Sequence, residues 1–61
     1  MTKLEELRRK AGLTQTDLSH KSGVATSTIS RLEVVGLNDA KVSTLLALAD
    51  AIGCRIGDFF A

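Results

Sequence analysis

One stretch of this chain decides its fold: S-G-V-A-T-S-T-I-S-R-L-E, from Ser22 to Glu33. Ile29 and Leu32 stand three residues apart, so both lie on one face of a helix that begins at Thr26. The opposite face carries hydrogen-bonding side chains, those of Ser27, Ser30 and Arg31. The stretch therefore predicts a short helix that packs through its apolar side and turns a polar side to solvent.

A second short helix is predicted directly before this one. Thr14 is its expected N-cap, with Asp17 three residues on, and Leu13 and Leu18 stand where a hydrophobic staple forms. The helix ends at Gly23, and a turn that contains glycine sets two short helices far from parallel. In this helix-turn-helix geometry the first helix braces the second, whose polar face is suited to a groove about 12 Å wide, the major groove of DNA.

Helices are also predicted on both sides of this motif. Before it, a capping-box pattern at Thr2 and Glu5 starts a helix that Gly12 ends. The apolar face of that helix is Leu4, Leu7 and Ala11. After it, residues 34–38 with Gly36 are expected to form a loop, and Asp39 is the expected cap of a helix that ends at Gly53. The apolar face of this later helix is Val42, Leu45, Leu46, Ala49 and Ile52.

A last short helix is indicated by the spacing of Ile56, Phe59 and Phe60. The prediction is thus an all-α fold, a compact five-helix domain with the helix-turn-helix at helices 2 and 3, and a single domain over residues 1–61. Its expected core is Ile29, Leu32, Leu45, Leu46, Ile52 and Phe59. A chain this small buries only about 60% of the surface that its unfolded form exposes, so the core is small.

Composition narrows the class of protein further. Hydrophobic residues make up 44% of the chain and charged residues 25%, a balance typical of a folded domain. The net charge of +1 is low for a protein that binds phosphates, so charge alone does not indicate DNA. The single cysteine, Cys54, has no partner for an internal disulfide, which fits a cytoplasmic setting. We expect no bound metal, no cofactor and no membrane segment, since the sequence lacks their patterns.

From about Leu4 to Phe60, the order and spacing of these motifs resemble those of the lambda-repressor and Cro-like (XRE-type) helix-turn-helix family. The resemblance is carried by L-E-E-L-R-R-K-A-G-L-T-Q-T-D-L, by S-G-V-A-T-S-T-I-S-R-L-E and by S-T-L-L-A-L-A-D-A-I-G. It implies a domain that binds double-stranded DNA in the major groove through the helix that begins near Thr26.

The resemblance also implies roles for individual residues. Residues that read bases are expected at Thr26, Ser27 and Arg31, and Arg31 is the strongest of them because it can donate two hydrogen bonds to one guanine. Phosphate contacts are expected at Gln15, Thr28, Ser30 and Lys10. Arg8 and Glu33 are expected to form an ion pair that ties the first helix to the base-reading helix.

Two features depart from the family pattern. Ala25 stands where a Ser or Thr N-cap is usual, so Thr26 is an alternative cap. The loop after Glu33 is apolar and one residue longer, and exposed Val35 and Leu37 there would mark a protein contact.

The functional expectation is a transcriptional regulator, a repressor that binds a palindromic operator as a homodimer. The alternative is an antitoxin-like interaction module that binds a protein partner and regulates its own promoter. An enzyme is not expected, because the sequence lacks a nucleophile with its base, a glycine-rich phosphate loop and a zinc pattern.

Overall fold

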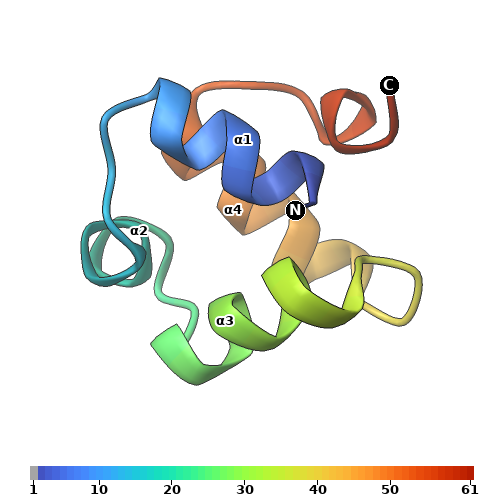
Figure 1. Cartoon of the computed structure of the whole chain (residues 1–61), viewed down its shortest axis with the longest axis horizontal. Coiled ribbons are helices and arrows are strands. Elements are labelled where there is room, and N and C mark those ends of the chain that lie inside the picture. Colours follow the sequence, from blue (N-terminus) through green and yellow to red (C-terminus); the bar gives the residue numbers. More distant parts are fainter. Residues whose placement is uncertain (1) are drawn as a thin grey trace.

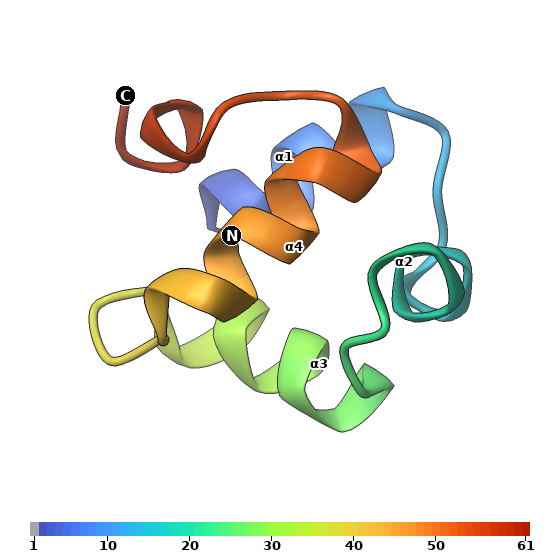
Figure 2. The ribbon, with the colours of Figure 1, turned by 180° about the vertical axis from the view of Figure 1, so that it is seen from behind.

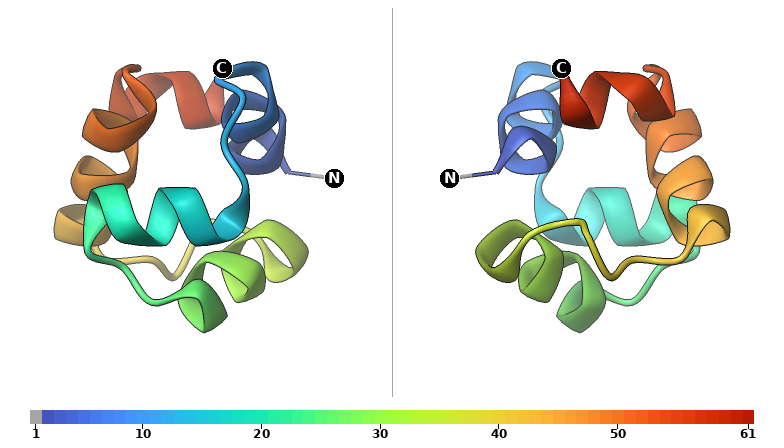
Figure 3. Two further views of the ribbon diagram at one scale, coloured as in Figure 1. Left: turned by 90° about the vertical axis from the view of Figure 1, so that its left-hand side faces the viewer. Right: turned by 90° about the vertical axis from the view of Figure 1, so that its right-hand side faces the viewer.

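Helices make up all the regular secondary structure of residues 2–61, the part of the chain that the computed structural model describes. They are α1 (Lys3–Lys10), α2 (Gln15–Ser22), α3 (Thr26–Val35), α4 (Val42–Ile52) and the 3-10 helix η1 (Ile56–Phe60). The all-α prediction is confirmed, but the fifth element is a 3-10 helix and not an α-helix. In Figures 1 and 3, α3 lies at one end of the molecule and η1 at the opposite end.

The ends of α2 are fixed by the local sequence as expected. The Asp17 backbone N–H donates to the Thr14 hydroxyl at 3.0 Å, and the Thr14 N–H donates to the Asp17 carboxylate, also at 3.0 Å. At the other end Gly23 has φ +78°, a left-handed conformation that costs glycine little. The backbone hydrogen bond from Gly23 to the Ser19 carbonyl closes the helix. The turn into α3 is therefore set by residues within the motif itself.

The start of α3 agrees with the prediction, whereas the start of α4 does not. The helix α3 begins at Thr26 and has Ala25 as its N-cap, whose methyl group cannot accept a hydrogen bond, so no side chain caps this end. The alternative, in which Thr26 is the cap, is wrong. The predicted cap of α4, Asp39, is wrong. The Ala40 N–H donates to the Leu37 carbonyl at 3.1 Å, which places Asp39 inside a turn, and α4 starts two residues later with Lys41 as its N-cap.

The core is made by one apolar face from each helix. Leu4, Leu18, Ile29 and Leu48 are fully buried, and around them pack Leu32, Leu37, Leu45, Ala49 and Phe59. The helix α2 packs against both α3 and α4, while α1 packs against α3 and η1. In Figure 2, which shows the molecule from behind, α4 lies at the front. One side of this helix therefore faces solvent.

Three of the core and loop predictions are wrong. Leu46 is 52% exposed, and Leu48 takes its place in the core. Leu37 is buried, with 8% of its surface exposed, although we predicted it at the surface. The predicted loop from residue 34 begins only at Gly36, because α3 continues through Val34 and Val35, whose side chains are 81% and 75% exposed.

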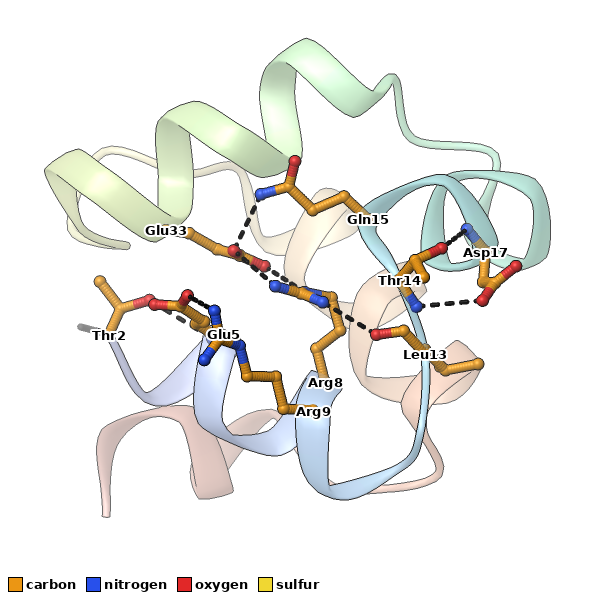
Figure 4. A network of polar contacts seen from close by, with 9 residues as sticks. All are labelled: Thr2, Glu5, Arg8, Arg9, Leu13, Thr14, Gln15, Asp17 and Glu33. Carbon is orange, nitrogen blue, oxygen red and sulfur yellow. Dashed lines mark hydrogen bonds and ion pairs between the residues drawn. The ribbon is translucent and has the colours of Figure 1, made fainter.

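A buried ion pair connects α1 to α3. The Arg8 Nε donates to Glu33 Oε2 at 2.7 Å and Arg8 Nη2 donates to Glu33 Oε1 at 3.2 Å, while Nη1 donates to the Leu13 carbonyl at 2.8 Å (Figure 4). Arg8 and Glu33 are 8% and 6% exposed. Burial by itself raises the pKa of Glu33, but the hydrogen bonds from Arg8 and Gln15 and the charge of Arg8 outweigh it and hold the pKa below its ordinary 4.5.

The different burial of two leucines in α4 gives a test of the packing. Leu48→Ala removes a fully buried side chain and is expected to lower the free energy of unfolding by about 2–5 kcal/mol. Leu46→Ala, the matched control on the exposed side of the same helix, is expected to change it by about 0.5 kcal/mol or less. Urea unfolding followed by circular dichroism measures both. Equal losses in the two variants would contradict the assignment of Leu48 to the core and Leu46 to the surface.

The ion pair also predicts how stability depends on pH. As the pH falls below 4.5, Glu33 in the unfolded chain takes up a proton before Glu33 in the folded chain, so the free energy of unfolding falls from about pH 5 to pH 3. Asp17 adds to this fall, because the Thr14 backbone N–H and hydroxyl lower its pKa.

The control is the double variant Arg8→Met/Glu33→Leu, which replaces the buried pair by apolar side chains of similar size. Urea unfolding between pH 7 and pH 3 is expected to show a smaller loss of stability in this variant than in the wild type. Parallel pH profiles for the two proteins would contradict the role given to Glu33.

Candidate nucleic-acid interface

The outer face of α3 is polar along most of its length. Thr26, Ser27 and Arg31 are exposed, and Thr28 and Ser30 are half-buried beside them. These five are among the residues that sequence reasoning assigned to bases and phosphates, and they lie on one helix at one end of the domain (Figure 3). Their hydroxyl and guanidinium groups can donate hydrogen bonds to base edges and to phosphate oxygens.

The rigidity of this face comes from the helices behind it. Ile29 and Leu32 anchor α3 in the core, and Glu33 ties its last turns to α1 through Arg8. Because backbone and buried side chains hold the helix from behind, its exposed side chains move with the whole domain. Such a helix can enter a groove as one body.

Gln15, the first residue of α2, lies against α3 and not free in solvent. Its side chain is half-buried, and Nε2 donates to Glu33 Oε1 at 2.9 Å (Figure 4). A phosphate contact is expected at Gln15, which has two possible donors, its backbone N–H and its side-chain amide. The structure directs one of the amide hydrogens to Glu33, whereas the backbone N–H lies in the first turn of α2, where helical N–H groups lack partners within the helix.

A hollow of about 270 Å³ separates α3 from the start of α4, and sequence reasoning did not foresee it. Its lining is Thr28, Arg31, Leu32, Asp39, Ala40, Lys41 and Thr44. Two cationic side chains and two hydroxyls thus meet beside the polar face of α3, opposed by the carboxylate of Asp39. The signal was available only in part: Lys41 precedes an apolar helical pattern, but its place beside Arg31 depends on the turn at residues 37–40.

Lys10, the fourth expected phosphate ligand, is not brought to this face. It is exposed at the end of α1, where it lines a smaller hollow of about 190 Å³ together with Ile52 and Cys54. In Figures 1 and 3 this end of α1 lies away from α3. The structure therefore places Thr28 and Ser30 on the same helix as the residues expected to read bases, brings Gln15 against Glu33 of that helix, and leaves Lys10 apart.

Residues 2–61 hold neither an activated thiol nor a cluster of metal-ligating side chains. Burial raises the pKa of the Cys54 thiol, and the negative charge of Asp58 adds to this, so the thiol stays protonated at neutral pH. Within these residues there is no cluster of three or more His, Cys, Asp or Glu side chains that could hold a metal ion. A membrane span needs about 20 apolar residues, and no helix in this part of the chain meets the length and hydropathy that a span requires.

Comparison with known families agrees with the geometry. A family model described as helix-turn-helix matches residues 4–59, which is almost the whole chain. Neither the curated proteins nor the solved structures contain a significant match. The matched segment includes α2, the turn at Gly23 and α3, together with the helices that brace them. This chain therefore belongs to the lambda-repressor and Cro-like (XRE-type) family of helix-turn-helix DNA-binding domains.

Proposed function

We propose that this protein is a transcriptional repressor that binds a palindromic operator as a homodimer, with one α3 in the major groove at each half-site. The observation that carries the proposal is the exposed polar face of α3, presented at one end of a domain that holds the helix rigidly from behind. Membership of a DNA-binding family supports the choice of double-stranded DNA as the ligand.

The roles of the residues follow from their positions. Arg31 reads a guanine, while Thr26 and Ser27, which have short side chains, make weaker contacts with neighbouring bases. The phosphate contacts come from Thr28 and Ser30, and from the start of α2 at Gln15. Lys10 is left out of this proposed interface because it lies away from α3.

Dimerisation is part of the proposal because one domain has little charge with which to hold DNA. The net charge is only +1, and Arg8 and Arg9 are engaged in ion pairs with Glu33 and Glu5. Exposed large apolar side chains are available for contact with a second copy, namely Val34, Val35, Val42, Leu46 and Phe60. Two linked domains bind two half-sites far more tightly than one domain binds one.

The antitoxin-like alternative is favoured by one of these features, the pair Val34 and Val35 at the end of α3. Two adjacent valines with 81% and 75% of their surfaces exposed are unusual at the end of a polar helix face, and a protein partner would cover them. Size measurement distinguishes the two functions. A homodimer that binds operator DNA without any other protein favours the repressor, whereas a monomer that binds operator tightly only with a second protein favours the alternative.

Selection of preferred duplexes from a random pool, at a stated salt concentration, tests the proposed function. We expect enrichment of a two-fold symmetric sequence whose half-sites are centred about 10 base pairs apart. We also expect affinity for the selected duplex to fall steeply with salt. A protein that enriches no sequence and whose affinity does not depend on salt would exclude the proposal.

Arg31→Ala tests the assignment of the strongest base contact. The variant is expected to lose about 1–3 kcal/mol of discrimination at one base pair of the selected sequence, because a bidentate contact to guanine is removed. Lys41→Ala is the matched control, since Lys41 lines the same hollow and is expected to weaken all duplexes alike. Binding to duplexes with every substitution at each position measures both variants. If Arg31→Ala also weakens all duplexes equally, Arg31 binds a phosphate and not a base.

A further inference from the structure

Glu33 receives more hydrogen bonds than the ion pair with Arg8 requires. Its Oε2 accepts from Arg8 Nε at 2.7 Å, and its Oε1 accepts both from Arg8 Nη2 at 3.2 Å and from Gln15 Nε2 at 2.9 Å. One carboxylate in α3 therefore binds a side chain from α1 and a side chain from α2. Among the residues described, every buried side-chain nitrogen or oxygen has a hydrogen-bond partner, so this network is fully satisfied.

The chemistry of Glu33 fixes the orientation of the Gln15 amide. An ionised carboxylate only accepts hydrogen bonds, so the nitrogen of the amide, and not its oxygen, must face Glu33. Figure 4 shows the amide oxygen of Gln15 pointing away from Glu33. The second N–H of the amide is held in the same plane, because rotation of the amide would break the bond to Oε1. Gln15 thus presents one N–H that has no partner among residues 2–61, and one oxygen, in a single defined orientation.

We propose that Glu33 is a positioning residue for DNA binding, which holds the Gln15 amide so that its free N–H donates to a phosphate oxygen of the DNA backbone. This inference rests on the proposed function, since it assigns a task to Gln15 within the same interface. A free glutamine side chain loses rotational freedom when it binds a phosphate, whereas Gln15 has already lost that freedom in the folded protein. The carboxylate therefore strengthens a DNA contact without touching DNA.

The bond between Glu33 and Gln15 has a signature in the protein alone. Gln15 is the only glutamine of the chain and Asn38 the only asparagine, so two side-chain amide groups give all such signals in a nuclear magnetic resonance spectrum. We expect the Gln15 amide proton that is bonded to Glu33 to exchange slowly with water, and the second Gln15 proton and both protons of exposed Asn38 to exchange fast. In Arg8→Met/Glu33→Leu the Gln15 protons are expected to exchange as fast as those of Asn38. Unchanged protection in that variant would overturn the proposal.

Binding of the selected duplex then tests the effect on DNA through four proteins: the wild type, Gln15→Ala, Arg8→Met/Glu33→Leu, and the triple variant. Gln15→Ala is expected to weaken binding about tenfold, as for loss of a hydrogen bond to a charged group. The salt slope is expected to stay the same, because an uncharged amide releases no counterion from the phosphate. In the background without Glu33, Gln15→Ala is expected to change affinity by less than about twofold. A role of Glu33 in folding alone would leave the effect of Gln15→Ala the same in both backgrounds.

The outcomes separate this inference from the proposed function. If the wild type selects an operator but Gln15→Ala binds it equally well, or loses tenfold in both backgrounds, the positioning role of Glu33 is wrong and the proposed function stands. If the wild type binds no duplex, the proposed function fails and the inference fails with it. Should the double variant not fold, Glu33→Asp replaces it, because the shorter side chain keeps a charge for Arg8 and withdraws the acceptor from Gln15.

Discussion

The carboxylate of Glu33 is the point on which this small domain depends. It is 6% exposed, and the two donors that bind it come from α1 and α2, so three of the helices meet at one side chain of α3. A buried charge without partners is costly, and the cost is avoided only when Arg8 and Gln15 occupy defined places. The apolar core can hold the helices together, but it resembles many other aliphatic cores. The directional bonds at Glu33 specify how α3 lies on α1 and α2.

The parts of the fold that sequence reasoning predicted well are those set by local chemistry. Thr14 and Asp17 cap α2 through bonds across three residues, and Gly23 ends it with a left-handed backbone, so no distant contact is needed. The helix α4 shows the opposite case. Its sequence V-S-T-L-L-A-L-A-D-A-I is apolar on most sides, so periodicity alone does not choose between Leu46 and Leu48. Packing against α2 makes that choice, and it buries Leu48.

The candidate site also has one part that local sequence predicts and another that only the tertiary structure reveals. The polar face of α3 was predictable because helical spacing alone places Ser27 and Arg31 opposite Ile29. The hollow beside Lys41 and the bond from Gln15 to Glu33 join residues that are far apart in the sequence. No local pattern encodes such pairs, and a resemblance to a family supplied the role of Gln15 but not its partner. The sequence analysis lacked the tertiary contacts. It named most residues of the site but not how their side chains are oriented.

The exposed surface of α3 changes from polar to apolar along the helix. This change connects DNA binding with the binding of a second protein. Its first turns expose Thr26, Ser27 and Arg31, whereas its last turn exposes Val34 and Val35. If the valines contact a second protein and the polar residues contact DNA, both partners bind the same rigid helix. Contact at one end then orients the other end without any change of conformation, because a helix of this length does not bend appreciably between its two halves. A domain with a net charge of only +1 can gain affinity in this way, because the alignment of two copies adds to the attraction between each copy and the phosphates.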